Sequence, residues 1–127
     1  MVTNDSLSDL VARVKNGYLS HAEVITLPWS RVKEAVLVVL KKTEYIADYE
    51  RKDNDLVVKL RYKGSDPAIV DIRRVSKPGV RIYAGVRELN SITRGLGYAI
   101  LSTPGGIMTH REAKKLNMGG EIICKVW

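Results

Sequence analysis

The sequence predicts an α+β protein made of two small α+β domains packed together. Residues 1–75 alternate between helical and strand-like apolar spacing, which predicts helices on a mostly antiparallel sheet. Residues 76–127 hold mainly strand-like segments and one strong helix start, which predicts a sheet-rich domain with a short helix. Between them, Ser-Lys-Pro-Gly at 76–79 has the composition of a turn, so we place the domain boundary there.

The N-terminal domain, residues 1–75, is expected to follow the order α-β-α-β-β-β. Leu7, Leu10 and Val14 recur at the spacing of one helix face, and Ser30 precedes a second such stretch as an N-cap. Apolar and mostly cationic residues alternate over 56–63, which is the clearest strand pattern. The expected elements are helices at 6–16 and 30–42 and strands at 23–27, 45–49, 56–63 and 69–75.

The C-terminal domain, residues 76–127, is expected to be built mainly from strands. Thr109 and Glu112 have the spacing of a capping box, which predicts a helix that ends at Gly119. Residues 88–94 form a short helix at most. The expected strands are 80–84, 98–102 and 121–127, with 107–108 continuing the sheet. In the last strand, alternate residues are expected to share one apolar face: Ile122, Cys124 and Val126.

The charge balance indicates a polyanionic partner. The chain of 127 residues has 21 Lys and Arg against 14 Asp and Glu, a net charge of +7. The excess is uneven, because residues 51–127 hold 15 basic and 7 acidic residues. A soluble basic protein of this size is typical of binders of nucleic acid or another polyanion.

Residue counts argue against an enzyme or a metal protein. Cys124 is the single cysteine, which excludes an internal disulfide, and His21 and His110 beside it are too few for a structural zinc site. We expect His110, one residue past a helix cap, to be exposed and Cys124 to be a buried, inert thiol. No nucleophile, base and orienting group are available together, so we expect no catalytic residues, no cofactor and no metal.

No targeting or membrane segment is visible in the sequence. The N-terminus lacks a basic stretch leading into an apolar run, and the longest purely apolar run, residues 35–40, is far shorter than a membrane span. We therefore expect a cytoplasmic protein without a membrane partner.

The loop at 102–106 is one candidate binding site. Ser102 and Thr103 supply hydroxyl groups, and Gly105 and Gly106 supply backbone that a ligand can approach closely. A helix start and three cations follow: Arg111, Lys114 and Lys115. This combination suits phosphate and sugar edges, but the same loop is also a good hairpin turn. Both interpretations stay open.

Cationic residues elsewhere give three further candidates. Arg81 and Tyr83 lie two apart on an expected strand, where they can stack on unpaired bases or belong to an ordinary amphipathic strand. A phosphate site at the start of the second helix would use Ser30, Arg31 and Lys33. An electrostatic footprint or a merely solvated sheet face is formed by Lys59, Arg61, Lys63, Arg73 and Arg74. The residues alone indicate nucleic-acid binding and do not separate RNA from DNA.

Longer segments resemble a known family. Leu-Ser-Thr-Pro-Gly-Gly-Ile-Met-Thr-His-Arg-Glu-Ala-Lys-Lys at 101–115, followed by Gly-Gly-Glu-Ile-Ile-Cys-Lys-Val-Trp at 119–127, resembles the small-subunit ribosomal protein S8 family of bacterial type. The resemblance extends over essentially the whole chain. Shorter segments in the same order support it: 9–16, 27–33, 44–46, 77–83 and 95–97.

The resemblance implies a function in the ribosome. Members of the family are structural constituents of the small subunit and primary binders of 16S rRNA. They grip an irregular helix of its central domain and help to assemble the 30S platform. The implied partners are this rRNA, ribosomal protein S5, other 30S proteins and, for some members, their own mRNA, which they repress. The chain would be a monomer outside the ribosome. The alternatives are a non-ribosomal RNA- or DNA-binding module and a translational repressor.

The resemblance also implies which residues bind rRNA. In the second domain these are Ser102, Thr103, Gly105, Gly106, Thr109, Glu121, Arg81 and Tyr83. The first domain would add a secondary backbone contact, for which the candidates are Ser30, Arg31 and Lys33. A carboxylate such as that of Glu121 can accept a hydrogen bond from a base amino group or a 2′-OH.

Two departures from the family pattern concern this site. Many members have Ser-Thr-Ser-Lys-Gly where this chain has Pro104 and Gly105 in the third and fourth positions. Proline removes a hydroxyl and a backbone donor, and glycine removes a cation. Basic residues that often follow the Arg-x-Tyr strand are replaced by Ala84 and Gly85. We therefore expect shape fit and cations elsewhere to contribute more of the affinity, and the salt dependence of binding to be shallower.

Overall fold

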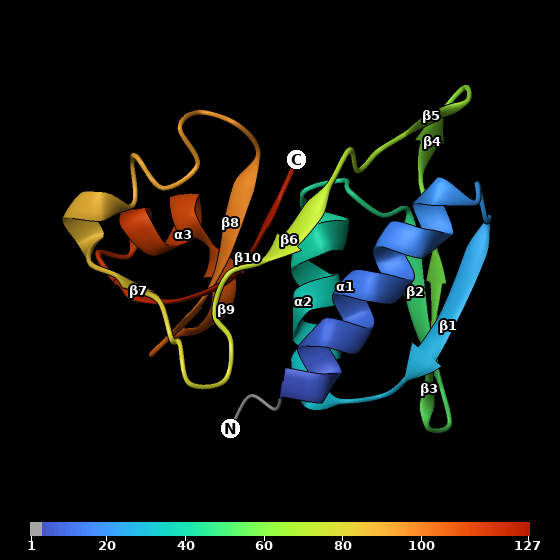
Figure 1. Cartoon of the computed structure of the whole chain (residues 1–127), viewed down its shortest axis with the longest axis horizontal. Helices are drawn as coiled ribbons and strands as arrows, with labels where there is room; N and C mark the ends of the chain where they lie inside the picture. The colour runs from blue at the N-terminus through green and yellow to red at the C-terminus, as the bar shows by residue number, and fades with distance from the viewer. Residues whose placement is uncertain (1–3) are drawn as a thin grey trace. The chain divides into compact units, whose positions relative to one another are not determined.

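The computed structural model describes residues 4–127, with side chains from Leu7 onward. The chain is an α+β protein with antiparallel sheets, and it divides into two compact units, Met1–Asp71 (unit 1) and Ile72–Trp127 (unit 2) (Figure 1). This division falls a few residues before the boundary expected from the turn at 76–79. The reason is that β6 (Ile72–Arg74) pairs antiparallel with β10 (Gly120–Val126) in the sheet of unit 2.

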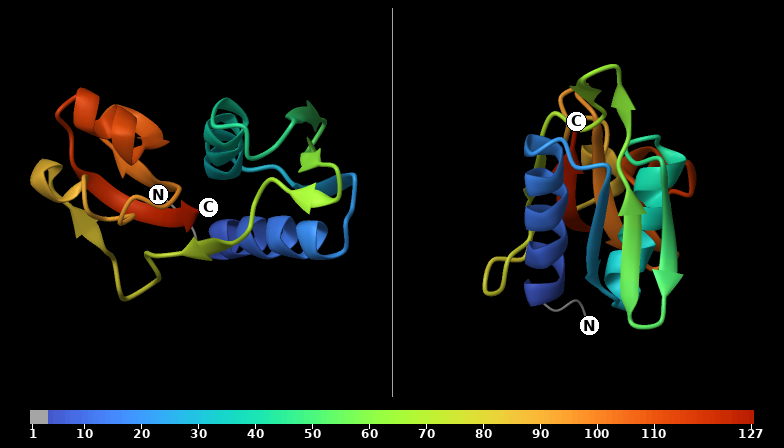
Figure 2. Two further views of the ribbon diagram at one scale, coloured as in Figure 1. Left: turned by 90° about the horizontal axis from the view of Figure 1, so that it is seen from above. Right: turned by 90° about the vertical axis from the view of Figure 1, so that its right-hand side faces the viewer.

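Unit 1 packs two helices on a three-stranded antiparallel sheet. The sheet has the order β1-β3-β2, and α1 and α2 cover one of its faces (Figures 1 and 2). Leu27 of β1 lies opposite Leu56 of β3, and both side chains are buried together with Leu10 and Leu40 of the helices. The bounds are α1 Asn4–Leu19, β1 Val24–Pro28, α2 Arg31–Lys42, β2 Asp48–Lys52 and β3 Asp55–Lys59.

Two strands of unit 1 differ from expectation. The strand expected at 45–49 begins only at Asp48, because the amide of Tyr45 still donates to Leu40 O and Glu44 has a φ of 65°. The strand expected at 56–63 ends at Lys59. Beyond it, the amide of Leu60 donates to Glu23 O, and the chain forms a separate hairpin of β4 (Tyr62–Lys63) and β5 (Asp66–Pro67).

Unit 2 is organised around β10, which pairs with β6, β7 and β8. Strand β8 also pairs with β9, so the sheet has the path β6-β10-β8-β9, with β7 beside β10. The core cluster lies between this sheet, α3 and η1, and it contains Ala84, Leu89, Ala99, Leu101, Met108, Ala113 and Ile122. The bounds are β7 Tyr83–Ala84, η1 Val86–Glu88, β8 Tyr98–Thr103, β9 Gly106–Thr109 and α3 His110–Lys115.

A β-bulge in β10 corrects one expectation. Ile122 lies opposite Leu101, whereas Cys124 lies opposite Ile100, so two residues of β10 match one step of β8. Since Leu101 and Ile100 point to opposite faces of the sheet, Ile122 and Cys124 also do. The expectation that Ile122, Cys124 and Val126 share one face was wrong, because a sequence does not reveal the extra residue.

The strand expected at 80–84 is reduced to Tyr83–Ala84. The preceding residues form a loop in which Lys77 and Val80 make an isolated bridge. The buried Ser76 closes this loop, because its hydroxyl donates to Ile82 O at 3.2 Å and accepts from Ile82 N at 3.0 Å. Because Ser76 fixes the backbone of Ile82, it also positions the neighbouring Arg81 at the edge of β7.

His110 is buried, which contradicts the expectation that it is exposed. The residue is 7% exposed, and its Nδ1 accepts a hydrogen bond from the amide of Ala99 at 3.1 Å. Burial, and secondarily the positive charge of Arg111, lower the pKa of His110 below 6.5. The imidazole is thus a neutral acceptor that satisfies a buried backbone amide of β8.

Acidification is expected to destabilise unit 2 through His110. The unfolded chain takes up the proton near pH 6.5, before the folded protein does, so the free energy of unfolding falls as the pH drops below that value. One such group changes stability by at most about 1.4 kcal/mol per pH unit. Urea unfolding at pH 7 and pH 5 measures the change, and a His110→Gln variant should have a smaller one. An equal pH dependence in both proteins would contradict this assignment.

Candidate nucleic-acid interface

Four side chains form a row across the outer face of the unit 2 sheet. Glu121 of β10 lies opposite Tyr83 of β7 on one side and Ser102 of β8 on the other, and Ser102 lies opposite Ile107 of β9. Residues directly opposite one another in an antiparallel sheet point to the same face. We call Tyr83, Glu121, Ser102 and Ile107 the outer row. The neighbouring set on these strands points instead into the core.

Two glycines allow the strands to approach at this row. A Cβ atom on Gly120 would lie 2.3 Å from Ser102 O, and one on Gly119 would lie 2.5 Å from Ala84 O. Both distances are far below a normal contact, so no other residue fits at either position without moving a neighbouring strand. The glycines therefore bring β10 close to β8 and β7 just before Glu121.

Glu121 of the outer row forms an ion pair with Arg81 beside an exposed aromatic ring. Arg81 Nη1 donates to Glu121 Oε2 at 3.1 Å, and the side chain of Glu121 is only 15% exposed. Tyr83 next to it is 67% exposed. This arrangement offers a ring face for stacking, a guanidinium for phosphate or base edges, and a carboxylate acceptor whose position is fixed by its partner.

The hydroxyl group of Thr103 forms hydrogen bonds within the β8–β9 turn. Thr103 Oγ1 donates to Gly106 O at 2.8 Å and accepts from Gly105 N at 3.2 Å. Gly106 has a φ of 113°, a region open to glycine, and a Cβ at this position would meet no neighbouring atom within 4 Å. In the part of the chain that the structure describes, the hydroxyl of Ser102 makes no hydrogen bond. Ser102 can therefore bond a ligand directly, whereas Thr103 holds the turn.

Thr109 serves as a helix cap. Its side chain accepts from the amide of Glu112 at 3.2 Å, which confirms the Thr109 half of the predicted capping box, and the residue is 5% exposed. The helix that it begins ends at Lys115, so the expected end at Gly119 was wrong. Gly105 lies against Met118, which is close enough that a Cβ at Gly105 would be 3.1 Å from its sulfur. The structure thus brings Tyr83, Glu121 and Ser102 together on a surface but places Thr109 beneath it.

The three candidates of unit 1 do not form a phosphate site together. Ser30 caps α2 as predicted, because its hydroxyl accepts from the amide of Lys33. Lys33 is 4% exposed, and its ammonium binds Asp9 Oδ2 at 3.0 Å and Pro28 O at 2.9 Å. Only Arg31 is exposed. A buried lysine was not foreseen because its partner Asp9 lies on another helix.

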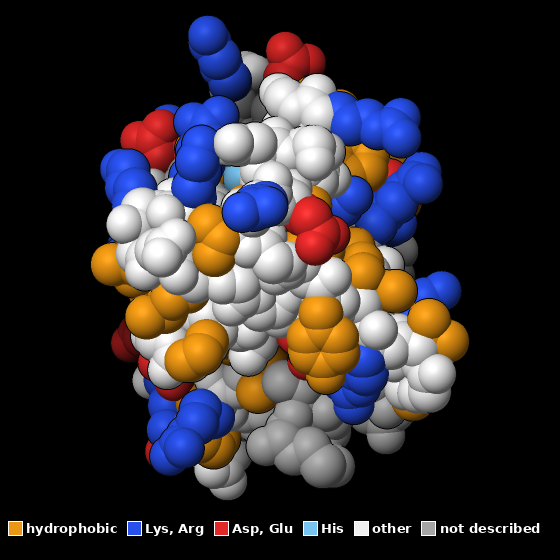
Figure 3. All heavy atoms as spheres, turned by 90° about the vertical axis from the view of Figure 1, so that its left-hand side faces the viewer, with side chains coloured by type: hydrophobic (Ala, Val, Ile, Leu, Met, Phe, Trp, Pro, Cys, Tyr) orange, Lys and Arg blue, Asp and Glu red, His pale blue; other side chains and the backbone are white. Residues whose placement is uncertain are grey.

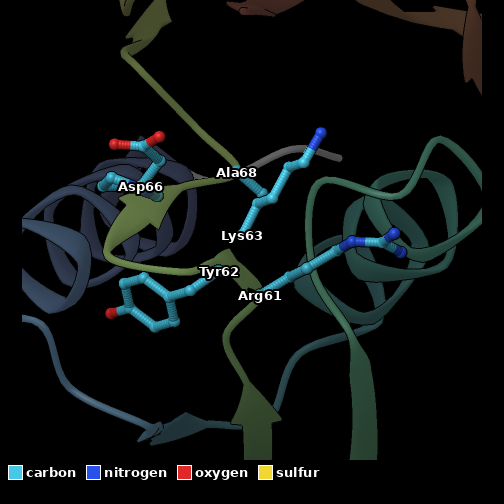
Figure 4. Close-up of a pocket in the computed structure, with 6 residues that line it drawn as sticks. Arg61, Tyr62, Lys63, Asp66 and Ala68 are labelled. Atoms are coloured by element: carbon cyan, nitrogen blue, oxygen red, sulfur yellow. The ribbon is translucent and has the colours of Figure 1, made fainter.

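The expected cationic strand is divided between two places. Lys59 lies on the sheet of unit 1, whereas Arg61 and Lys63 lie in the segment that leads through the β4–β5 hairpin. There they line an open cavity of about 590 Å³, and their side chains extend away from those of Tyr62 and Asp66 (Figure 4). The nearest carboxylate oxygen to the Arg61 guanidinium is that of Glu44, at 3.9 Å.

Other basic residues are already engaged within unit 2. The Arg73 guanidinium lies 5.7 Å from the centre of the Trp127 ring, and Arg74 Nε donates to Ser76 O at 2.8 Å.

Burial raises the pKa of the Cys124 thiol to about 12, so it is not a nucleophile at neutral pH. Among the described residues, no three His, Cys, Asp or Glu side chains gather in the way a metal ion requires. None of the described helices is long and apolar enough to cross a membrane.

Comparison with known proteins identifies the family. A family model described as Ribosomal protein S8 matches residues 5–127. The chain belongs to the ribosomal protein S8 family. A relative from Thermosynechococcus vestitus, named small ribosomal subunit protein uS8, is 42% identical over 133 residues that cover both chains completely.

Two further S8 relatives have a similar sequence identity to this chain. The uS8 protein of Thermus aquaticus is 44% identical over 135 residues, which cover 97% of this chain and 98% of the relative. The uS8 protein of Dictyoglomus thermophilum is 43% identical over 131 residues and covers both chains completely. The resemblance inferred from the sequence is thus confirmed along its whole length.

The longest S8-like segments contain three of the four residues of the outer row, Ser102, Ile107 and Glu121. Residues 101–115 run through β8, β9 and α3, and residues 119–127 include β10. The close approach at Gly119 and Gly120 was not foreseen from the sequence. The Gly-Gly pair directly before a strand was the signal for it, since a glycine in a strand often marks a close backbone contact.

Proposed function

We propose that this S8 chain is a structural constituent of the small ribosomal subunit that binds 16S rRNA through the outer row of unit 2. The relatives carry the name small ribosomal subunit protein. Unit 2 holds 10 Lys and Arg against 3 Asp and Glu, a net charge of +7, whereas unit 1 holds 11 of each. The whole positive excess of the chain therefore lies in the unit that has the outer row.

The observation that supports the proposal most is the pairing of Tyr83, Glu121 and Ser102 across three strands. In a regular A-form stem, bases are inaccessible to side chains through the deep major groove, so recognition favours irregular loops with unstacked bases. The Tyr83 ring stacks on such a base. Glu121 accepts from an amino group or a 2′-OH, and Ser102 donates to the sugar or phosphate.

The proposed target is an irregular helix of the central domain of 16S rRNA, where binding helps to assemble the 30S platform. A preformed sheet surface loses little conformational entropy on binding, so it can recognise the shape of the RNA without first rearranging its own structure. The role is structural and takes place in the cytoplasm. Ribosomal protein S5 and other 30S proteins are the proposed neighbours. A hairpin in the chain's own mRNA with the same irregular shape would use the same outer row.

Replacing both exposed groups of the outer row is expected to reduce specific binding. A Tyr83→Ala, Ser102→Ala double variant removes stacking, worth about 1–3 kcal/mol per base, and one hydrogen bond, so affinity for a central-domain rRNA hairpin should fall about 10- to 1,000-fold. Thr103 is left unchanged because its hydroxyl holds the turn. Filter binding against a scrambled duplex of equal length, over a range of salt, measures the effect.

A Tyr83→Phe, Ser102→Ala variant is the matched control, because it keeps the ring and should retain most of the preference. The wild-type chain must prefer the hairpin to the scrambled duplex. If it does not, or if the Tyr83→Ala, Ser102→Ala variant keeps the wild-type preference, the outer row is not the recognition surface.

A further inference from the structure

Most of the positive charge of unit 2 lies away from the outer row. Arg81 is the cation at the row, and Glu121 neutralises it. Four exposed cations occur instead on η1 and α3, and we call them the basic face: Arg87, Arg111, Lys114 and Lys115. Within the described residues, none of the four forms an ion pair with a carboxylate. Their charge is therefore available to an external anion.

The basic face is held in place by contacts within unit 2. Arg111, Lys114 and Lys115 have the i, i+3, i+4 spacing that puts side chains on one side of a helix. Lys114 Nζ donates to Asn90 Oδ1 at 2.5 Å, which ties α3 to the segment after η1. The Arg111 guanidinium lies 5.1 Å from the centre of the Tyr98 ring. The cations are thus partly ordered before a ligand arrives.

The basic face and the outer row lie on opposite sides of unit 2. The strand residues that alternate with the outer row, Leu101, Met108 and Ile122, are packed in one cluster with Leu89 after η1 and Ala113 of α3. Consequently η1 and α3 cover the inner face of the sheet. A layer of helix is about 10 Å thick. A stem resting on the outer row therefore does not reach the outward side of α3.

The surroundings of these cations suit a polyphosphate better than a protein. Protein–protein interfaces are depleted in lysine, whereas a phosphate backbone is bound by unpaired Lys and Arg without any need for shape complementarity. Figure 3 views unit 2 from the side on which η1 and α3 lie in Figure 1, and it shows several Lys and Arg side chains together with some Asp and Glu side chains.

We propose that the basic face binds the phosphate backbone of a second RNA segment, which flanks the stem contacted by the outer row. This inference rests on the proposed function and assigns the two tasks to different surfaces of unit 2. The outer row recognises the irregular stem, and the basic face adds affinity without sequence preference. The cations of the basic face would also compensate for the hydroxyl group, the backbone donor and the positive charge that the turn lacks because of Pro104 and Gly105.

The test compares two RNAs and two variants. One RNA is the central-domain hairpin alone, and the other is the same hairpin with its flanking helices. The variant Arg87→Gln, Lys114→Gln, Lys115→Gln removes three charges from the basic face. The control variant Lys41→Gln, Lys42→Gln, Lys52→Gln replaces three lysines at exposed positions of unit 1 that belong to none of the candidate binding sites.

We expect the basic-face variant to bind the hairpin alone as the wild type does. On the longer RNA, the slope of log K against log salt should decrease by about 2 to 3, since each lost phosphate contact contributes about 0.7–0.9. The control variant should match the wild type on both RNAs. An unchanged slope on the longer RNA, an equal loss on the hairpin alone, or an equal loss in the control variant would overturn the second contact.

The two proposals fail in different ways. If the wild type does not prefer the hairpin to a scrambled duplex, the outer row proposal fails irrespective of the basic face. If that preference is present but the basic-face variant binds both RNAs normally and still dissociates from 30S particles in a salt wash, the basic face contacts a protein. That result would overturn its assignment to RNA.

Discussion

Replacing Gly120 with alanine is expected to destabilise unit 2 by about 3 kcal/mol and to impair RNA binding. The new methyl group would lie 2.3 Å from Ser102 O and 3.1 Å from Thr103 Cγ2, so β10 and β8 must separate. Overpacking of this kind costs about 1–3 kcal/mol, and more where the obstacle is backbone that cannot rotate away. This separation would move Glu121 of β10 away from Ser102 of β8, which lies opposite it.

Thermal unfolding and RNA binding measure the two consequences. Gly85→Ala is the matched control, because it is the same change in the same unit but the nearest atom, Glu88 Oε1, is an ordinary 3.5 Å from the new methyl group. Its stability should stay within about 1 kcal/mol of the wild type. If Gly120→Ala and Gly85→Ala behave alike, the close approach of β10 and β8 does not determine the geometry of the outer row.

A Lys33→Ala substitution is expected to destabilise unit 1 by about 3 kcal/mol. It removes a buried four-carbon stem and leaves Pro28 O without its hydrogen-bond donor. Asp9 keeps Arg13 as a partner at 2.7 Å, so its charge is not left unpaired. Burial raises the pKa of Asp9, but hydrogen bonds and charge from Arg13 and Lys33 outweigh it and hold the pKa below 3.8. The stability gained from this pair is therefore present at neutral pH and is lost as the pH falls through that lowered value.

The ion pair of Lys41 with Asp48 provides the control on the same helix. Both side chains are more than half exposed, so Lys41→Ala should change the stability of unit 1 far less than Lys33→Ala does. Fluorescence of Trp29, whose ring lies 3.9 Å below the Arg51 guanidinium, reports unfolding of unit 1 in a Trp127→Phe background. Equal losses for Lys33→Ala and Lys41→Ala would contradict the distinction between the buried and the exposed pair.

A second substitution at the same position tests whether Lys33 also contacts RNA. As a residue bound within unit 1, it should contribute nothing to the salt dependence of RNA binding, so a Lys33→Met variant should keep the wild-type slope. A decrease of about 0.7–0.9 in that slope would show that Lys33 contacts a phosphate group. Arg31, which is exposed, is the remaining candidate at this end of α2.

Local patterns predicted the features that depend on neighbouring residues. The caps at Ser30 and Thr109 were foreseen because three or four consecutive residues determine them. Cys124 is buried as expected, but not on a face shared with Ile122. His110 was placed wrongly because its acceptor role depends on the amide of Ala99, which only the fold brings near. Lys33 and Asp9 are a similar case. The outer row likewise needs the register of four strands, which no pattern in the sequence provides.

The bulge in β10 has a consequence for how this chain can vary in evolution. Because the extra residue between Ile122 and Cys124 sets which way every later side chain points, a deletion there would turn Glu121 or Cys124 to the wrong side of the sheet. Related chains are thus expected to tolerate substitutions in this strand but not changes in its length. Insertions should instead collect at the Gly64–Ser65 tip of the β4–β5 hairpin, where an altered loop length leaves both sheets in register.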